Sequence, residues 1–297
     1  MSDGGQTDGA GRTHGTADAT TVDRRYLLKL SRPRFWFYLA GPVVVGVAYG
    51  AATVSDLVSP PALALFAYFL VPANVLLYGV NDVFDADVDE SNPKKSGREV
   101  RYTGNRVVVA AVVVAGLLVV VPVALTPSRA WPYLAGFLLL GVGYSAPPLR
   151  FKTTPLLDSL SNGLYVLPGA AAYAAVSGAP PPALALLGGW LWTMAMHTFS
   201  AVPDVDPDRA AGIRTTATVL GERGAYAYCA VCWTLAALAF AALDWRLAVP
   251  LAVYPLFTAA VAASSVDVSR AYWWFPALNT AVGALLTMGG LWRLVYG

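Results

Sequence analysis

The chain has 297 residues, of which 57% are hydrophobic and only 13% are charged. This composition excludes an ordinary soluble globular protein and predicts an all-α membrane protein. The net charge of +2 says little by itself, and no nucleic-acid partner is expected.

Residues 1–23 differ in character from the rest of the chain. They consist mainly of Gly, Thr, Asp and Ala without apolar periodicity, so they cannot bury a core and are expected to form a disordered N-terminal tail. The first apolar run begins at Phe35 and is long enough to span a bilayer, which predicts a retained helix and not a cleaved signal peptide. Residues 24–297 are expected to form one polytopic domain.

Apolar runs follow one another along this domain. A spanning helix needs roughly 20 residues, and nine runs are candidates on that measure. They are 35–54, 60–80, 107–125, 131–145, 158–177, 182–200, 224–243, 247–264 and 272–292. The fourth run is short, and Gly141, Gly143 and Pro147-Pro148 indicate that its helix stops early, before a loop that is buried in protein or lines a cavity. The sequence thus predicts nine transmembrane helices.

The basic residues predict an orientation in the membrane. With the N-terminus in the cytoplasm, all of the 20 Lys and Arg residues except Arg129, Arg246 and Arg293 fall in cytoplasmic segments. Because basic loops are retained on the cytoplasmic side, we expect a multi-pass protein of the cell membrane with a cytoplasmic N-terminus. The loops after helices 2 and 6 are then cytoplasmic caps.

A cluster of acidic residues directly follows the second run. Asp82, Asp85 and Asp89 (i, i+3, i+7) fall within about 60° on one helical face, with Asn81 on the adjoining strip, whereas Asp87 points away. Carboxylates on one stripe repel one another unless a cation lies between them, and Mg²⁺ prefers oxygen ligands of this kind. The cluster predicts a metal and diphosphate site that faces the cytoplasm. The alternative is a solvated acidic helix end.

A second acidic cluster follows the sixth run. Asp204 and Asp208 (i, i+4) share a helical face, while Asp206 faces elsewhere. Two facing carboxylate stripes suit two metal ions and favour an enzyme. The alternative from another class is a cation or proton transporter, but transport carboxylates tend to lie at mid-helix depth and both clusters lie at helix ends.

Basic residues accompany both clusters. Lys94 and Arg98 follow the first cluster, and Arg209 and Arg214 follow the second. The loop after the fourth run adds Arg150 and Lys152 on the same side. Such cations meet the phosphate charge that metal ions leave uncompensated. The alternative role of a basic stretch beside a membrane is contact with anionic lipid.

Three segments carry a resemblance to a known family: Asn81-Asp82-x-x-Asp85-x-x-x-Asp89, Tyr144-x-x-Pro-Pro-Leu-Arg-x-Lys152 and Asp204-x-x-x-Asp208. They resemble the UbiA-type intramembrane prenyltransferases, and the resemblance covers nearly the whole chain. It implies nine transmembrane helices around a central cavity that opens laterally to lipid, with Mg²⁺ as cofactor and a prenyl diphosphate as donor.

The resemblance also implies roles for individual residues. The implied catalytic metal ligands are Asp82, Asp85, Asp89, Asp204 and Asp208. The implied diphosphate-binding residues are Asn81, Lys94, Arg98 and Lys152, with Arg32 in an Arg-Pro pair before the first helix.

Two longer stretches, residues 81–102 and 197–217, resemble the carotenoid-acting branch of this family. Haloarchaeal and actinobacterial members of that branch add a C5 isoprenyl unit to each end of lycopene on the way to C50 carotenoids such as bacterioruberin. The resemblance implies dimethylallyl diphosphate as donor, lycopene or another lipophilic acceptor, and addition of water. Two alternatives stay open within the family, namely geranylgeranyl transfer in archaeal ether-lipid synthesis and aromatic prenylation in quinone synthesis.

His197 and Tyr144 are candidates for an acceptor site. His197 precedes Asp204 by seven residues and shares its helical face unless Pro203 interrupts the register. An aromatic acceptor would require such a base or orienting group, whereas a carotenoid needs no strong base; satisfied packing is the alternative role of His197. Cys229-x-x-Cys232 lies within an apolar run and is expected to pack, not to act as a redox pair.

Overall fold

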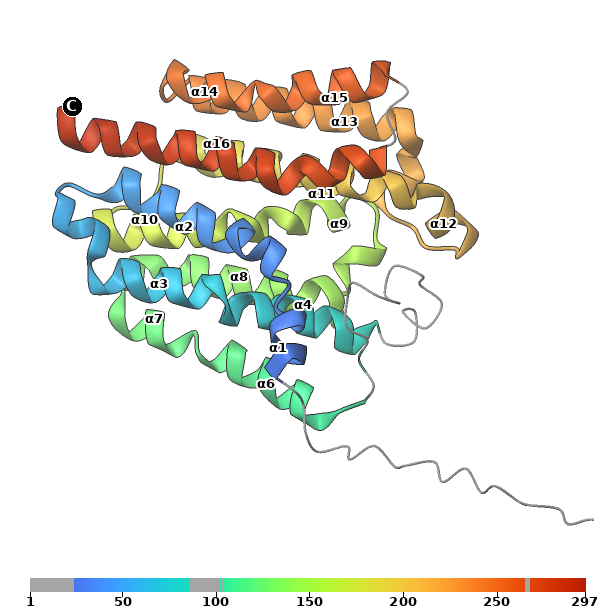
Figure 1. Ribbon diagram of the computed structural model, residues 1–297, viewed down its shortest axis with the longest axis horizontal. Helices are drawn as coiled ribbons and strands as arrows, with labels where there is room; N and C mark the ends of the chain where they lie inside the picture. The colour runs from blue at the N-terminus through green and yellow to red at the C-terminus, as the bar shows by residue number, and fades with distance from the viewer. Residues whose placement is uncertain (1–23, 86–101, 103, 265–267) are drawn as a thin grey trace, which may run out of the picture.

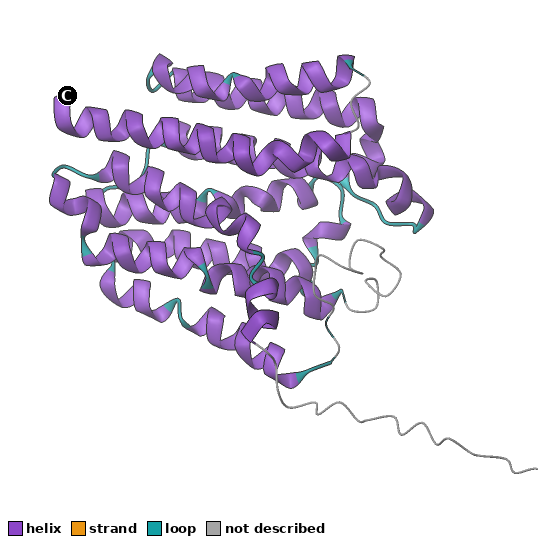
Figure 2. Ribbon diagram, in the orientation of Figure 1, coloured by secondary structure: helices purple, strands orange, loops and turns teal. Residues whose placement is uncertain are grey.

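The computed structural model describes residues 24–85, 102, 104–264 and 268–297, and every regular element in these ranges is a helix (Figures 1 and 2). In chain order the α-helices are α1 (Arg24–Leu30), α2 (Trp36–Gly50), α3 (Pro60–Leu70), α4 (Pro72–Phe84), α6 (Arg106–Leu117), α7 (Val120–Leu125), α8 (Trp131–Ser145), α9 (Leu157–Leu160), α10 (Leu167–Ser177), α11 (Ala183–Ala201), α12 (Val205–Ala210), α13 (Thr216–Ala241), α14 (Trp245–Leu251), α15 (Val253–Ala263) and α16 (Val268–Tyr296). Short 3-10 helices join some of them. The all-α expectation is confirmed for this part of the chain.

Each of the nine apolar runs coincides with one of these helices or with consecutive helices. Four continuous stretches are long and apolar enough to cross a membrane: Pro60–Phe84, Arg106–Leu125, Thr216–Ala241 and Trp245–Ala263. The count of nine spans and the cytoplasmic caps stay predictions.

Proline explains the break inside the second run. Pro72 takes the first position of α4, where its missing N–H is harmless, but it cannot continue α3 without a clash. Val71 therefore leaves the helical region, with φ −124° and ψ −58°. The two helices together form one interrupted span.

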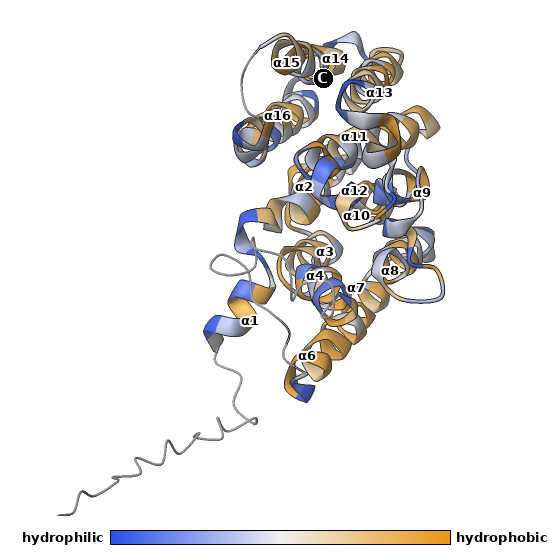
Figure 3. Cartoon of the chain, turned by 90° about the vertical axis from the view of Figure 1, so that its right-hand side faces the viewer, coloured by the Kyte–Doolittle hydropathy of each residue, from blue (hydrophilic) through white to orange (hydrophobic). Residues whose placement is uncertain are grey.

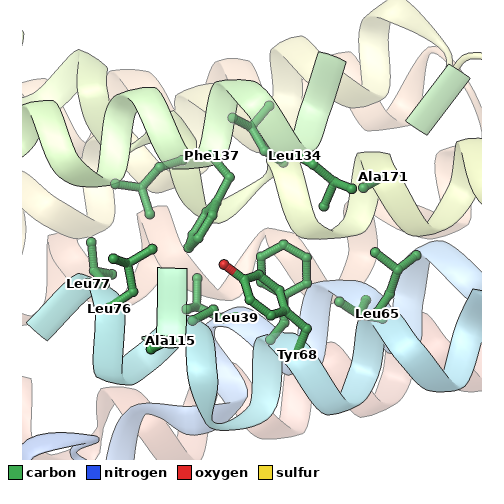
Figure 4. Close-up of a cluster of buried hydrophobic side chains, with 14 of the residues drawn as sticks. Leu39, Leu65, Tyr68, Leu76, Leu77, Ala115, Leu134, Phe137 and Ala171 are labelled. Carbon is green, nitrogen blue, oxygen red and sulfur yellow. The ribbon is translucent and has the colours of Figure 1, made fainter. Parts of the chain in front are cut away.

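The helices pack around two apolar cores. The first lies among α2, α3, α4, α6, α8 and α10 (Figure 4). In it, Phe69 and Phe137 meet edge to face with ring centroids 5.0 Å apart. The second lies among α11 and α13 to α16 and is built mainly of aromatic rings. There Trp233 stacks on Tyr254 at 5.3 Å, and Phe199 packs on Phe275 at 4.8 Å.

Helix α2 joins the two groups of helices, because it packs against α10 on one side and α16 on the other. Small residues make its approach to α10 close. A Cβ atom on Gly46 would lie 2.2 Å from the carbonyl oxygen of Gly169, and one on Gly169 would lie 2.7 Å from that of Pro42. Close packing through small residues is how helices associate in lipid, where burial of apolar surface gives no advantage.

Hydrophobic residues occur along most of the helices (Figure 3), and many of them are exposed on the outside of the bundle. Val114 and Leu117 on α6, Leu238 on α13 and Met288 and Trp292 on α16 are all exposed. Exposed apolar area of this extent is unfavourable in water and is what a lipid-facing surface requires.

Candidate active site

The first acidic segment lies at the end of α4. The helix ends at Phe84, and Asp85 has left the helical conformation, although its N–H still donates to the Asn81 carbonyl at 3.0 Å. Asp82, in the last turn, is buried, with 2% of its surface exposed. Its Oδ1 accepts from Nη2 of Arg32 at 3.0 Å, which ties the start of the chain's first long helix to this site.

Asp85 meets two cations from the loop after α8. Its carboxylate contacts Nζ of Lys152, and its Oδ1 lies 3.4 Å from Nη2 of Arg150. Burial, reinforced by the nearby Asp82 carboxylate, raises the pKa of Tyr26 on α1 above its usual value. Segments from three parts of the chain therefore meet around two carboxylates.

The second acidic segment follows α11. Asp204 ends the 3-10 turn Val202–Asp204, and Asp206 and Asp208 belong to α12. Asp204 and Asp208 are half-buried, whereas Asp206 is exposed. The C-terminus of α4 and helix α12 lie at the same end of the bundle (Figure 1).

The carboxylates fit Mg²⁺ in the kind of atom that they offer. Hard oxygen donors suit this ion, and Asp82 and Asp85 lie one helical turn apart. Within the described ranges no group of three or more His, Cys, Asp or Glu side chains forms a metal cluster by itself. Asp89, the third carboxylate of the first motif, lies outside the described residues, as do Lys94 and Arg98.

A cavity of about 1040 Å³ begins beside these segments. Arg32, Asn81 and Ser200 line it at the end that carries the acidic segments, and Tyr49 and Arg293 line it at the opposite end. Lining residues on α2 extend from Phe37 to Tyr49, about 18 Å at the rise of an α-helix. Most of the wall between these ends is apolar or aromatic.

Tyrosine rings surround the polar end of the cavity. The guanidinium of Arg32 lies over the ring of Tyr78, 4.6 Å from its centroid, and Tyr38 and Tyr165 meet edge to face at 6.4 Å. All three tyrosines line the cavity. Their faces carry negative potential, so a cation that formed here would be stabilised.

A line of polar and aromatic contacts leads from the first acidic segment across the cavity wall. Asn81 donates to Oγ of Ser145 at 3.1 Å. The neighbouring Tyr144 ring meets the imidazole of His197 edge to face, with centroids 5.8 Å apart. Nε2 of His197 lies 3.7 Å from Oδ2 of Asp158. Tyr144 and His197, the two residues expected near an acceptor, thus lie together in the cavity wall.

The sequence reasoning missed Asp158. It stands at the start of the predicted span 158–177, on the short helix α9, and is 1% exposed. An acidic residue within an otherwise apolar run is the signal that could have found it, because such residues in membrane helices are usually functional. Arg150 was expected as a cation on this side of the membrane, but its ion pair with Asp85 was not.

The cavity is apolar, lies within a membrane bundle, and has carboxylates and cations at one end. This arrangement is typical of an enzyme that binds an anionic group beside a lipophilic substrate. The UbiA prenyltransferase family matches residues 39–294. The chain therefore belongs to this family, and it is a membrane-embedded prenyltransferase. Because the family consists of prenyltransferases, the chain is an enzyme, and the alternative of a cation or proton transporter is not supported.

Relatives of known name are similar over almost the whole chain. Lycopene elongase/hydratase of Haloferax volcanii is 64% identical over 290 residues, covering 97% of this chain and 96% of its own. Lycopene elongase/hydratase of Halobacterium salinarum is 62% identical over 273 residues, covering 92% and 99%. Similarity to the carotenoid-acting branch is thereby confirmed.

Solved structures share the fold. A UbiA homologue from Archaeoglobus fulgidus, bound to dimethylallyl diphosphate (DMAPP) and Mg²⁺, superposes with a TM-score of 0.71 at 20% identity and covers 92% of this chain and 100% of that one. The homologue bound to geranyl diphosphate (GPP) and Mg²⁺ gives 0.69 at 19% identity, with 90% and 99% covered.

Proposed function

We propose that this enzyme transfers a C5 isoprenyl group from dimethylallyl diphosphate to the ends of lycopene, with addition of water, in the synthesis of C50 carotenoids. The observation that carries the proposal is the identity of 62–64% to two lycopene elongase/hydratases over more than nine-tenths of this chain. The apolar cavity with one charged end agrees with a lipophilic acceptor and a diphosphate donor.

The donor binds at the charged end. Asp82, Asp85, Asp89, Asp204 and Asp208 would hold Mg²⁺, which supplies charge neutralisation for the departing diphosphate. Lys152 and Arg32 already lie against Asp85 and Asp82, so they would meet phosphate oxygens beside the same carboxylates. Asn81 would donate to the diphosphate, and Lys94 and Arg98 would add positive charge.

The prenyl chain of the donor lies against the tyrosines. When the C–O bond breaks, the allylic carbon becomes cationic, and the rings of Tyr78 and Tyr165 can stabilise it. The apolar wall keeps bulk water from this carbon until the acceptor reacts. The electron pair of the terminal double bond of lycopene then forms the new C–C bond, which leaves a tertiary cation on the acceptor.

The acceptor enters from the bilayer, end first. An apolar polyene has no favourable route through water, so access from lipid is required. Only one end of the molecule has to reach Asn81, and the apolar wall along α2 accommodates the chain behind it. Because both ends are modified, the same cavity acts twice, and the C45 intermediate must be released or reversed between the two turns.

The active site faces the cytoplasm. Among the described segments, the start of α6, the loop after α8 and α12 carry basic residues and lie at the end of the bundle where α4 ends, while α14 and the C-terminus lie at the other end (Figure 1). Arg246 and Arg293, two of the three exceptions to the distribution, belong to those two elements. By the positive-inside rule this distribution supports a cytoplasmic N-terminus.

Expression in a lycopene-producing bacterial host, followed by pigment analysis, tests the proposal. We expect C45 and C50 carotenoids with added isoprenyl units and terminal tertiary hydroxyl groups. Unchanged lycopene, in a host that supplies dimethylallyl diphosphate and with membrane insertion verified, would contradict it. That result would favour geranylgeranyl transfer to a glycerol phosphate.

A further inference from the structure

Asp158 is a buried carboxylate that the metal and diphosphate site does not use. Its Oδ2 accepts from the backbone N–H of Thr216 at 2.9 Å, and its Oδ1 accepts from the Thr216 hydroxyl. These contacts fix the carboxylate at the N-terminus of α13, where positive potential favours its charged form. A buried charge is costly without a partner, and His197 lies on its open side.

His197 connects this carboxylate to the cavity. Its Nε2 lies 3.7 Å from Oδ2 of Asp158, and its side chain lines the cavity with 17% of its surface exposed. The edge-to-face contact with Tyr144 limits rotation of the imidazole. A proton taken up by His197 would therefore form an ion pair with a carboxylate that is already in place.

Few of the described side chains that line the cavity are carboxylates or imidazoles. Among the described lining residues, Asp244 is the other candidate. Asp244 is exposed, accepts from the backbone N–H of Arg246 at 2.9 Å and begins α14, at the end of the bundle away from α4 and α12 (Figure 1). His197 is the base on the side where the donor would react.

We propose that His197 is the catalytic base for water addition to the acceptor and that Asp158 is its positioning residue. The assignment rests on the proposed function. After the C–C bond forms, a lone pair of water forms a C–O bond to the tertiary cation. One O–H bond of that water breaks, its electrons stay on oxygen, and the proton passes to the imidazole of His197, where Asp158 stabilises the positive charge.

The transfer step itself needs no base. Without His197 the tertiary cation loses a proton from a neighbouring carbon, and the product is an elongated alkene lacking one molecule of water. The share of hydroxylated product among all elongated products therefore measures the base separately from prenyl transfer. This ratio does not depend on how much protein folds, because only active molecules contribute to it.

The test compares His197→Gln with Ser200→Ala in the lycopene-producing host, with products resolved by chromatography and mass. Ser200 lines the same cavity one turn further along α11 and donates to the His197 carbonyl, so it controls for changes in the wall. We expect His197→Gln to elongate lycopene while its ratio of hydroxylated to dehydrated product falls by about 100-fold, a typical contribution of a general base. Ser200→Ala should keep the wild-type ratio.

Asp158→Asn should lower the same ratio by about tenfold, because its amide keeps the shape but not the charge. An unchanged ratio in this variant would overturn the positioning role. Two results with His197→Gln would contradict its role as the base. One is an unchanged ratio of hydroxylated to dehydrated product, and the other is loss of elongation in a well-folded variant. If the wild-type enzyme elongates lycopene without adding water, the base assignment is wrong. If it makes no elongated product, the proposed function is wrong as well.

Discussion

The two acidic segments share a sequence pattern but differ in how the structure holds them. Asp82 is buried and ion-paired to Arg32, and Asp85 contacts two cations of the loop after α8. In the second segment Asp204 and Asp208 are half-buried, on a 3-10 turn and the short helix α12. A repeated motif therefore does not give two equivalent environments.

The difference suggests a division of work. The first segment gathers the start of α2, the end of α4 and the loop after α8, so its carboxylates are held in place before a donor binds. The second segment is connected to α13 by Arg209, whose Nε donates to the Thr218 carbonyl at 2.9 Å. We expect the first segment to fix the position of the diphosphate and the second to complete the metal site around it.

Removal of divalent metal tests what the two segments have in common. If both hold Mg²⁺, chelation by EDTA should abolish diphosphate release, and added Mg²⁺ should restore it, because carboxylates alone repel the donor. Diphosphate release by purified enzyme in lipid is the measurement. Full activity in EDTA would mean that Arg32, Lys152 and their neighbours suffice for the donor.

Substitution in the first segment should have the next largest effect. Asp82→Asn keeps the volume of the buried side chain but removes a charged oxygen ligand, so activity should fall by roughly 100-fold or more while the protein stays folded. Asp56→Asn is the matched control, because Asp56 is half-buried in the turn Val54–Val58 after α2, away from the acidic segments. Similar losses in both variants would show that the change acts on folding and not on the site.

Much of the fold follows from the sequence because an uncharged apolar run has few alternatives in lipid. The predicted run 131–145 coincides with α8, and 182–200 differs from α11 by one residue at each end. The predicted run 60–80 ends too early. An apolar run ends before the polar residue Asn81, whereas the helix α4 continues to Phe84. The break of this run at Pro72 was also missed.

Contacts between distant segments were beyond the sequence. The helical periodicity grouped Asp82 with Asp85, but it could not show that Arg32, fifty residues earlier, pairs with Asp82. Nor could it bring Asp158 beside His197, since these residues lie on different helices and no single motif contains both. Helical periodicity shows which residues share one face of a helix. Which other helix that face contacts depends on tertiary packing, which periodicity does not show.

Two variants of the second segment test whether Asp204 and Asp208 lie on the functional face and Asp206 does not. Asp204→Ala should lower diphosphate release by roughly 100-fold, because it deletes a ligand on the half-buried face. Asp206→Ala removes an equal charge from the exposed face and should change the rate by no more than about twofold. Equal losses at both positions would show that the shared face of Asp204 and Asp208 is not the functional one.

The cations of the first segment offer the smallest and most specific comparison. Lys152 and Arg150 both contact Asp85, but the Lys152 side chain is 13% exposed and that of Arg150 is 37% exposed. A cation held away from water interacts more strongly with a phosphate oxygen, so Lys152→Met should raise the KM for the donor by about tenfold. Arg150→Met should raise it by no more than about threefold, since solvent screens an exposed charge. Steady-state kinetics at varied donor concentration separate the two, and a larger effect at Arg150 would mean that the diphosphate lies on the outer side of Asp85, away from the cavity.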